Sequence, residues 1–301
     1  MENFSLETQE LINQAWEVRN RNFPKEIEFD YPEATEVVTL TGKNCALDCA
    51  HCGGHYLQGM KTIEEVEDKH SCAGHKSKHN GKEIKSCLIS GGCDSHGKVP
   101  FMQQLPFISD LKTSKKLNFH VGLVNSEEAK NLKDLADVVS FDFVADDETV
   151  SEVFGLGRKA EDYLYTYREL RKNLKVLPHI CIGLKGGELA GEYRALELLA
   201  QEGVDGLVFI VFIPTPGTRY ADRQPPALEE VVRLLAQARL KFPDKPIFLG
   251  CMRPKGRYRQ ALDLAALRCG VNKIVVPTRA TVNLAQELGL KVSYGEECCV
   301  L

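Results

Sequence analysis

The chain has 301 residues, 43% of them hydrophobic and 27% charged, with a formal net charge of −4. These values allow a sizeable core and exclude general disorder, and the length is typical of an α/β barrel built as one domain. The net negative charge disfavours a nucleic-acid binder that neutralises phosphates, so we expect a small molecule or a protein as the partner.

The first expected element is a helix over residues 6–20, which either plugs the bottom of the fold or covers its outside. The start of the chain lacks the basic region and apolar core of a signal peptide. The longest apolar run, residues 206–214, is too short to cross a bilayer. We therefore expect a cytoplasmic protein without a membrane segment.

Eight short runs rich in aliphatic and β-branched residues follow, separated by longer amphipathic segments. They predict strands near residues 36–41, 87–91, 118–124, 138–144, 177–183, 207–213, 246–250 and 273–277. Between them we expect helices at 125–136, capped by Ser126, at 228–240 and near 279–289. Eight strand–helix units predict an α/β fold, a (β/α)8 TIM-type barrel with an N-terminal helix and a C-terminal tail over the barrel mouth.

We expect a single domain over residues 1–301, with an N-terminal extension (1–34), the barrel (35–289) and the tail (290–301). The polar stretch 69–86 is the one candidate for a mobile excursion. In such barrels the chemistry lies at the carboxyl ends of the strands and in the loops that follow them. The unusual motifs of this sequence all fall on that face.

Three cysteines, Cys45, Cys49 and Cys52, directly follow the first predicted barrel strand. Structural zinc sites usually take their ligands in pairs, four in total, and this triplet fits that pattern poorly. Three thiolates suit a four-iron cluster better, because one iron then remains open to an exchangeable small molecule. The alternatives are zinc, with His51 or His55 as fourth ligand, and coincidental clustering.

The C-x3-C-x2-C spacing after the first strand of a barrel resembles the signature of the radical S-adenosylmethionine superfamily. The resemblance implies a [4Fe-4S] cluster on the three cysteines, with S-adenosylmethionine bound to the free iron. In that family an electron from the cluster cleaves the sulfonium and generates a 5′-deoxyadenosyl radical. The hard chemistry would then belong to the cofactor, while the protein supplies orientation and a dry cavity.

The same resemblance implies further cofactor-binding residues: Ser90, Gly91, Gly92, Asp142, Ile182 and Pro214. The first three match the glycine-rich element that contacts the methionine amino group, and Asp142 matches the polar residue for the ribose hydroxyls. Ile182 lies in a run that resembles the element near the adenine, and Pro214 begins a P-x-x-G-T turn. Each also has an architectural interpretation, as a strand-end turn, a loop-capping aspartate or ordinary barrel packing.

The resemblance covers nearly the whole chain and falls within the biotin-synthase-like branch, carried by the segments LISGG, HVGLV, GEYRALE, GCMRP and EECC. Some members of this branch form a two-component lipoyl synthase, in which two related radical enzymes insert two sulfurs into an octanoyl chain. Biotin synthase proper also needs barrel-lining cysteines and an arginine for a two-iron cluster. That whole set is not found in this sequence, so biotin formation is the weaker match.

Eight cysteines remain beyond the triplet. Cys87, Cys181 and Cys269 lie within or beside apolar segments and are expected to be small buried hydrophobes. A second iron–sulfur cluster is predicted on some of the others, namely Cys93, Cys251, Cys298 and Cys299, with Cys72 in reserve. The alternatives are an exposed, oxidation-prone tail and, around Cys72, a histidine-rich loop that binds zinc or is simply solvated.

The sequence thus predicts a radical S-adenosylmethionine enzyme that inserts sulfur into a protein-bound octanoyl group during lipoyl cofactor synthesis. The implied partners are an octanoylated lipoyl-carrier protein or peptide, a second radical enzyme component and an electron donor such as ferredoxin or flavodoxin. Arg253 and Arg257 either bind a substrate carboxylate or a partner's acidic surface, or are solvated. The alternatives are biotin formation, carbon-skeleton rearrangement, hydrogenase-cofactor maturation and a zinc-stabilised scaffold without catalysis.

Overall fold

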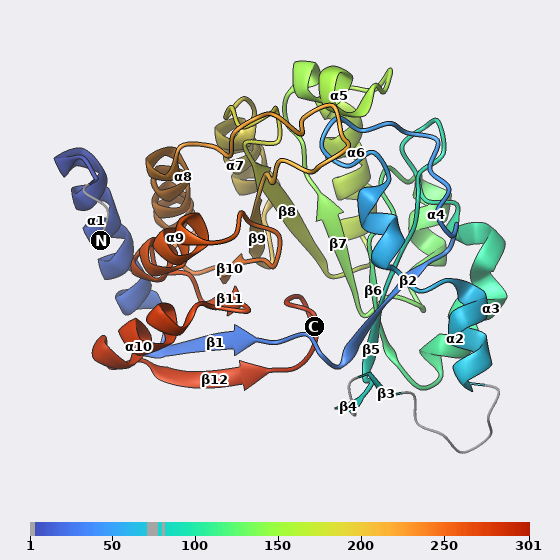
Figure 1. Ribbon diagram of the computed structural model, residues 1–301, viewed down its shortest axis with the longest axis horizontal. Helices are drawn as coiled ribbons and strands as arrows, with labels where there is room; N and C mark the ends of the chain where they lie inside the picture. Colours follow the sequence, from blue (N-terminus) through green and yellow to red (C-terminus); the bar gives the residue numbers. More distant parts are fainter. Residues whose placement is uncertain (1–3, 71–77, 80–81) are drawn as a thin grey trace.

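The computed structural model describes residues 4–70, 78–79 and 82–301. Its central element is a curled sheet of ten strands (Figure 1). The strands are β1 (Glu26–Asp30), β2 (Thr35–Thr39), β5 (Ser86–Ser90), β6 (Lys116–Phe119), β7 (Val138–Asp142), β8 (Val176–Ile182), β9 (Leu207–Val211), β10 (Ile247–Leu249), β11 (Lys273–Val275) and β12 (Lys291–Gly295). Their order is β12-β1-β11-β10-β9-β8-β7-β6-β5-β2, and neighbouring strands are parallel.

All eight predicted barrel strands are present, as β2 and β5 to β11. The sequence analysis missed β1 and β12, which lie in the segments assigned to the extension and the tail. β1 pairs with β11 on one side and with β12 on the other, so the sheet ends at β12 and β2. The fold is therefore a partial TIM-type barrel, in which the predicted closed ring is a curled open sheet.

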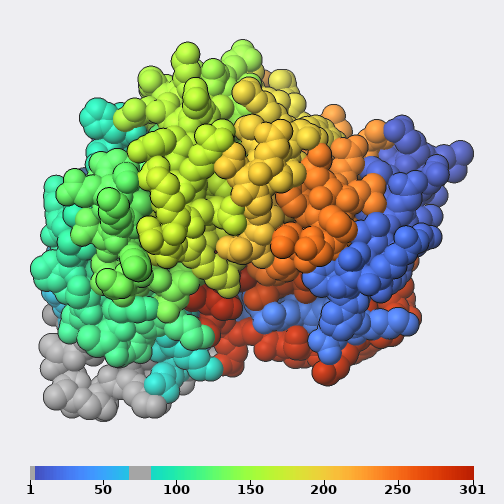
Figure 2. Space-filling model, turned by 180° about the vertical axis from the view of Figure 1, so that it is seen from behind, coloured from blue at the N-terminus to red at the C-terminus, as the bar shows by residue number. Residues whose placement is uncertain are grey.

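Helices cover the outside of the sheet (Figure 1 and Figure 2). They are α1 (Leu6–Asn22), α2 (Ile63–His70), α3 (Leu105–Lys112), α4 (Ser126–Asn131), α5 (Asp147–Phe154), α6 (Ala160–Arg171), α7 (Glu192–Glu202), α8 (Leu228–Lys241), α9 (Arg257–Arg268) and α10 (Arg279–Glu287). Two short 3₁₀ helices, η1 (His55–Gly59) and η2 (Phe101–Gln104), and a small hairpin of β3 (Lys78–His79) and β4 (Lys82–Glu83) complete the described part. Within it, no helix is long and apolar enough to cross a membrane.

Two helix predictions can be compared in detail with the structure. The N-terminal helix is confirmed; it packs mainly against α8 on the outside of the fold, where Glu229 accepts hydrogen bonds from Ser5 N and Thr8 Oγ1. The predicted cap of α4 was one residue off. Asn125 is the N-cap, because its side chain accepts from Glu128 N at 2.9 Å while the Glu128 carboxylate accepts from Asn125 N at 2.9 Å.

The C-terminal tail does not cross the mouth of the barrel as predicted. After β12 the chain turns to the end where the strands begin, and Glu296 and Glu297 pair with Lys85 and Lys116 at 2.9 and 2.7 Å. Figure 1 shows the chain end curled between β1 and β5. The last residues then fill this end of the barrel and pack on Val138, Leu177, Val208 and Val275. Burial of Cys299 and Val300 gives the tail a hydrophobic reason to enter the fold rather than lie across it.

Candidate functional site

A cavity of about 500 Å³ lies within the curl of the sheet, in the size range of small-molecule and cofactor pockets. Most of the predicted site residues line it: Cys45, Cys49, Cys52, Ser90, Gly91, Gly92, Cys93, Asp142, Cys251, Cys298 and Cys299. Ile182 and Pro214 are not among its lining residues, although their neighbours Cys181 and Ile213 are. The structure thus brings together residues that are up to 254 positions apart in the sequence, from Cys45 to Cys299.

The cysteine triplet lies on the loop that follows β2, at the carboxyl end of the sheet. All three thiols are half-buried, and Cys45 Sγ accepts a hydrogen bond from Cys93 N at 3.3 Å. Burial is the main cause that raises the pKa of the Cys49 thiol to about 12, and the charges of the neighbouring Cys52 and Cys45 add to it. Three thiolates in this position therefore need a compensating positive charge, and a backbone N–H directed at sulfur is typical of protein-bound iron–sulfur clusters. The donor set fits the predicted cluster.

Gly92 allows the loop after β5 to lie directly against the triplet loop. A Cβ atom at this position would be 1.9 Å from Asn44 O. Gly92 N donates to Thr41 Oγ1 at 2.7 Å, and this hydroxyl donates to Asn44 O at 3.0 Å. Glycine is needed here for the contact between the two loops, whereas the predicted contact with a methionine amino group stays a prediction.

Gly92→Ala should therefore displace the triplet loop and reduce cluster incorporation, because the added methyl group collides with backbone rather than with a movable side chain. We expect a destabilisation of about 1–3 kcal/mol and a marked loss of iron after anaerobic reconstitution. Thermal unfolding and iron analysis measure the two effects. Gly157→Ala is the matched control, since a Cβ there meets no atom within 4 Å; equal iron contents of the two variants would contradict the prediction.

Asp142 ends β7 and is paired with a histidine that the sequence analysis did not single out. His120 Nε2 and Asp142 Oδ2 are 3.0 Å apart, and both residues line the cavity. Burial alone would raise the pKa of Asp142, but the charge and hydrogen bond of His120 lower it to about 2. The carboxylate is therefore ionised, and one of its two oxygens already has a protein partner.

A second histidine, His179, faces the same cavity from β8. Its ring is stacked with that of His120 at a centroid distance of 6.5 Å, and its Nδ1 lies 3.0 Å from Leu177 O. Because a carbonyl only accepts, His179 Nδ1 carries the proton, and the Nε2 lone pair remains available. Burial lowers the pKa of His179 to about 4, so this ring is neutral at physiological pH.

The four cysteines predicted to hold a second cluster fall into two groups. Cys93 lies beside the triplet, next to Cys45. Cys298 and Cys299 enter from the tail at the end of the cavity where the strands begin. Cys251 follows β10, and its thiol lies near enough to Cys298 for the charge of that thiol to act on it. The Cys251 side chain is exposed to the cavity but is otherwise surrounded by protein. This burial is the main cause that raises the pKa of its thiol, and the charge of Cys298 is the second. Cys93 is therefore grouped with the triplet.

Hydrogen bonds hold the Cys298 thiol in place. Asn118 Nδ2 lies 3.5 Å from Cys298 Sγ, and the Asn118 carbonyl oxygen is fixed by Ser140 N and Oγ at 3.2 and 3.0 Å. A hydrogen bond with the Cys299 thiol is the main cause that lowers the pKa of Cys298 to about 7 despite its burial. Hydrogen bonds with the backbone of Val300 and the side chain of Asn118 add to this effect. Among the described residues, no three His, Cys, Asp or Glu side chains converge on a single metal ion.

The remaining cysteine predictions have mixed outcomes. Cys87 and Cys269 are buried as expected, each 1% exposed. Cys181 was predicted to be a buried hydrophobe, but it is half-buried and lines the cavity, because residues 177, 179 and 181 alternate onto the inner face of β8. Cys72 and its histidine-rich surroundings lie largely outside the described residues.

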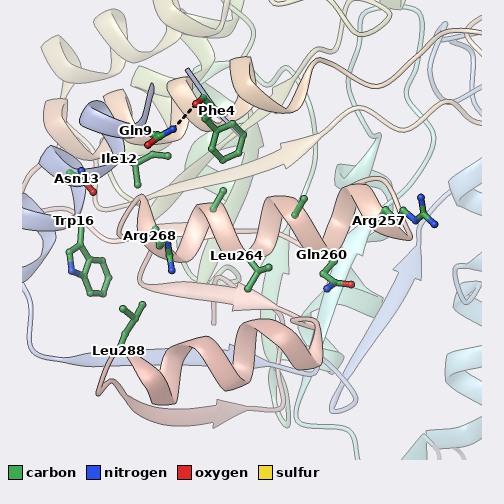
Figure 3. Close-up of a pocket in the computed structure, with 12 residues that line it drawn as sticks. Phe4, Gln9, Ile12, Asn13, Trp16, Arg257, Gln260, Leu264, Arg268 and Leu288 are labelled. Carbon is green, nitrogen blue, oxygen red and sulfur yellow. Dashed lines mark hydrogen bonds between the residues drawn. The ribbon is translucent and has the colours of Figure 1, made fainter. Parts of the chain in front are cut away.

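The two arginines that follow Cys251 have different positions. Arg253 is buried and paired with Asp263, with Nε–Oδ1 and Nη2–Oδ2 distances of 2.7 and 3.1 Å, so it does not bind a substrate or partner. Arg257 lies on the outside, at one end of a groove of about 810 Å³ between α1 and α9 (Figure 3). The described residues of this groove include no Cys, His, Asp or Glu, and the reactive side chains are in the inner cavity.

No known protein-family profile matches the chain. A biotin synthase of Francisella philomiragia is 27% identical over 312 residues, which cover 96% of this chain and 95% of the relative. A biotin synthase of Francisella tularensis is 27% identical over 318 residues, covering 98% and 97%. The chain thus spans nearly the full length of both relatives.

Two solved structures share the fold. The FeFe-hydrogenase maturase HydG of Carboxydothermus hydrogenoformans has a TM-score of 0.67 at 15% identity, with coverage of 97% of this chain and 73% of that chain. Methylornithine synthase has a TM-score of 0.66 at 15% identity, with coverage of 97% and 91%. At such identities the likeness concerns the fold.

Proposed function

We propose that the chain, which is similar over nearly its full length to biotin synthases, is a biotin-synthase-like enzyme of the radical S-adenosylmethionine superfamily that inserts sulfur at an unactivated carbon. The single observation that carries the proposal is the arrangement of thiols in the inner cavity. Cys45, Cys49 and Cys52 line it from the loop after β2, and a second group of thiols, Cys251, Cys298 and Cys299, lines the same cavity from other segments. A substrate between the two groups would be within reach of both.

The triplet would hold the [4Fe-4S] cluster, with S-adenosylmethionine beside it. When bound, these groups would supply the agent that removes a hydrogen atom from the substrate. The chain's own part is to bind and orient. Gly92 and Asn44 hold the triplet loop in place through close backbone contact, and Asp142 presents an ionised carboxylate to the cavity for the ribose hydroxyls.

A second iron–sulfur cluster on Cys251, Cys298 and Cys299 would be the sulfur source. Its support is that these thiols line the same cavity and that their charges act on one another. The Asn118 amide beside Cys298 adds a hydrogen-bond donor of the kind that stabilises cluster-bound thiolates. Cys93 does not belong to this set, since it lies next to Cys45.

The near full-length likeness to biotin synthases supports a biotin-synthase-like reaction more directly than it supports lipoyl synthesis. Sulfur insertion into a protein-bound octanoyl chain is our second proposal. It is favoured by the apolar side chains that line part of the cavity and suit an alkyl chain, namely Val37, Leu88, Val208 and Ile210. In that case an octanoylated carrier protein or peptide, a second radical enzyme component and an electron donor such as ferredoxin or flavodoxin would be the partners.

The deciding experiment offers two substrates in parallel to anaerobically reconstituted, reduced protein with S-adenosylmethionine. One is the sulfur-free precursor of biotin, and the other is an octanoylated carrier domain or peptide. Mass spectrometry of the products and quantification of 5′-deoxyadenosine measure the outcome. A sulfur-containing product from either substrate supports sulfur insertion and identifies the substrate class. 5′-Deoxyadenosine without any sulfur-containing product favours a rearrangement or maturation reaction, and zinc in place of iron and sulfide favours the scaffold.

A further inference from the structure

His120 is held rigidly beside Asp142. Its backbone N–H donates to Ile89 O at 2.9 Å, and its carbonyl accepts from Ser90 Oγ at 2.9 Å, so β5 fixes it from both sides. Its side chain then meets the Asp142 carboxylate at 3.0 Å. Ser90 thus has a structural task of its own, which is to place His120.

Several titratable groups face the His120–Asp142 pair from the surrounding elements. They are His179 and Cys181 on β8, His51 on the triplet loop, Tyr163 on α6, Cys93 after β5 and Cys298 on the tail. His179 is neutral, as described above, and burial likewise lowers the pKa of His51. Burial would lower the pKa of His120 as well, but the charge and hydrogen bond of Asp142 raise it above its usual value. His120 is therefore the imidazole of this group whose protonated form the surroundings favour.

We infer that His120 is a positioning residue, which orients the Asp142 carboxylate in the cavity and sets the net charge of the pair through its own proton. The inference deepens the proposed function and rests on it, because the ligand concerned is S-adenosylmethionine. When His120 is protonated, the pair is neutral overall; when His120 is neutral, the pair carries one negative charge. S-adenosylmethionine carries a sulfonium, an ammonium and a carboxylate, so it is a net cation and binds better to the negatively charged pair.

The expected result is that the affinity for S-adenosylmethionine rises roughly tenfold as the pH increases through the titration of His120. His120→Gln retains an N–H donor for Asp142 but cannot change its charge. This variant should show a weaker pH dependence of affinity than the wild type across the same range, and should bind more tightly than the wild type at the acidic end. His120→Leu loses the donor as well, and should bind more weakly than His120→Gln at every pH.

Equilibrium dialysis of the cluster-reconstituted protein between about pH 6 and pH 8.5 measures these affinities, around the usual histidine value. Iron content and thermal unfolding of each variant establish that fold and cluster are retained. Asp142→Ala is the second test variant. It should bind S-adenosylmethionine more weakly than the wild type and should lose the pH dependence of binding. If His120→Gln keeps the wild-type pH profile, the inference is overturned while the proposed function stands. If the wild-type protein with intact cluster does not bind S-adenosylmethionine, the proposed function is overturned and the inference with it.

Discussion

Replacing Cys45, Cys49 and Cys52 together by alanine should reduce the cleavage of S-adenosylmethionine to 5′-deoxyadenosine below detection. The three thiols lie on one loop and line one end of the cavity, and no iron would remain there to bind the cofactor. Chromatographic quantification of 5′-deoxyadenosine under reducing, anaerobic conditions measures the effect. Iron analysis should show the loss of one four-iron cluster per chain.

Cys269→Ala is the matched control for this prediction. Its thiol is buried, donates to Val232 O and is not part of the cavity lining, so the substitution removes a sulfur without touching either thiol group. The control should keep wild-type iron content and cleavage activity, apart from a modest loss of stability. Cleavage that persists in the triple variant would refute the assignment of the triplet and, with it, the superfamily mechanism for this chain.

The features of this fold that sequence could predict are those encoded within short segments. The eight barrel strands are runs of aliphatic residues whose burial on both faces gives a direct signal. β1 and β12 carry two glutamates, a lysine and an exposed tyrosine, and they are strands only because β1 pairs with β12 on one side and with β11 on the other. This pairing joins segments about 265 residues apart, as Glu26 and Lys291 show, and no local pattern reports it.

The same distinction applies to the site. The triplet is local in sequence and was predictable from its spacing. The neighbours of Asp142 were not, because whether His120 and His179 point inward depends on strand register. Inward alternation along β8 was a usable signal that the sequence analysis did not exploit.

The predicted path of the tail shows a further limit of sequence reasoning. The length of the tail alone does not give its direction. Burial of Cys299 and Val300 favours the end of the fold where the strands begin, and the lysines that pair with Glu296 and Glu297 stand there, at the start of β5 and β6.

The course of the tail determines how the second cluster can be tested. Deleting residues 298–301 would remove Cys299 and Val300, which are 6% and 3% exposed and pack in the core at the amino end of the sheet. Such a truncation should destabilise the fold by several kcal/mol through the cavity it leaves, whatever the thiols do. Cysteine-to-serine substitutions separate the loss of the thiols from the loss of stability, since they keep the size of the side chain nearly unchanged.

Cys251→Ser combined with Cys298→Ser should abolish formation of the sulfur-containing product while cleavage of S-adenosylmethionine continues. The wild-type protein should contain iron for two four-iron clusters, the double variant iron for one, and the triplet variant iron for the other. The reason is that Cys251 and Cys298 line the same cavity as the triplet but belong to other segments, after β10 and in the tail, so each set can be removed without the other. Cys181→Ser is the control, because Cys181 lines the same cavity outside both groups and should keep both clusters. Iron for a single cluster in the wild-type protein, with none left in the triplet variant, would contradict the sulfur-insertion proposal and leave a one-cluster reaction such as a carbon-skeleton rearrangement.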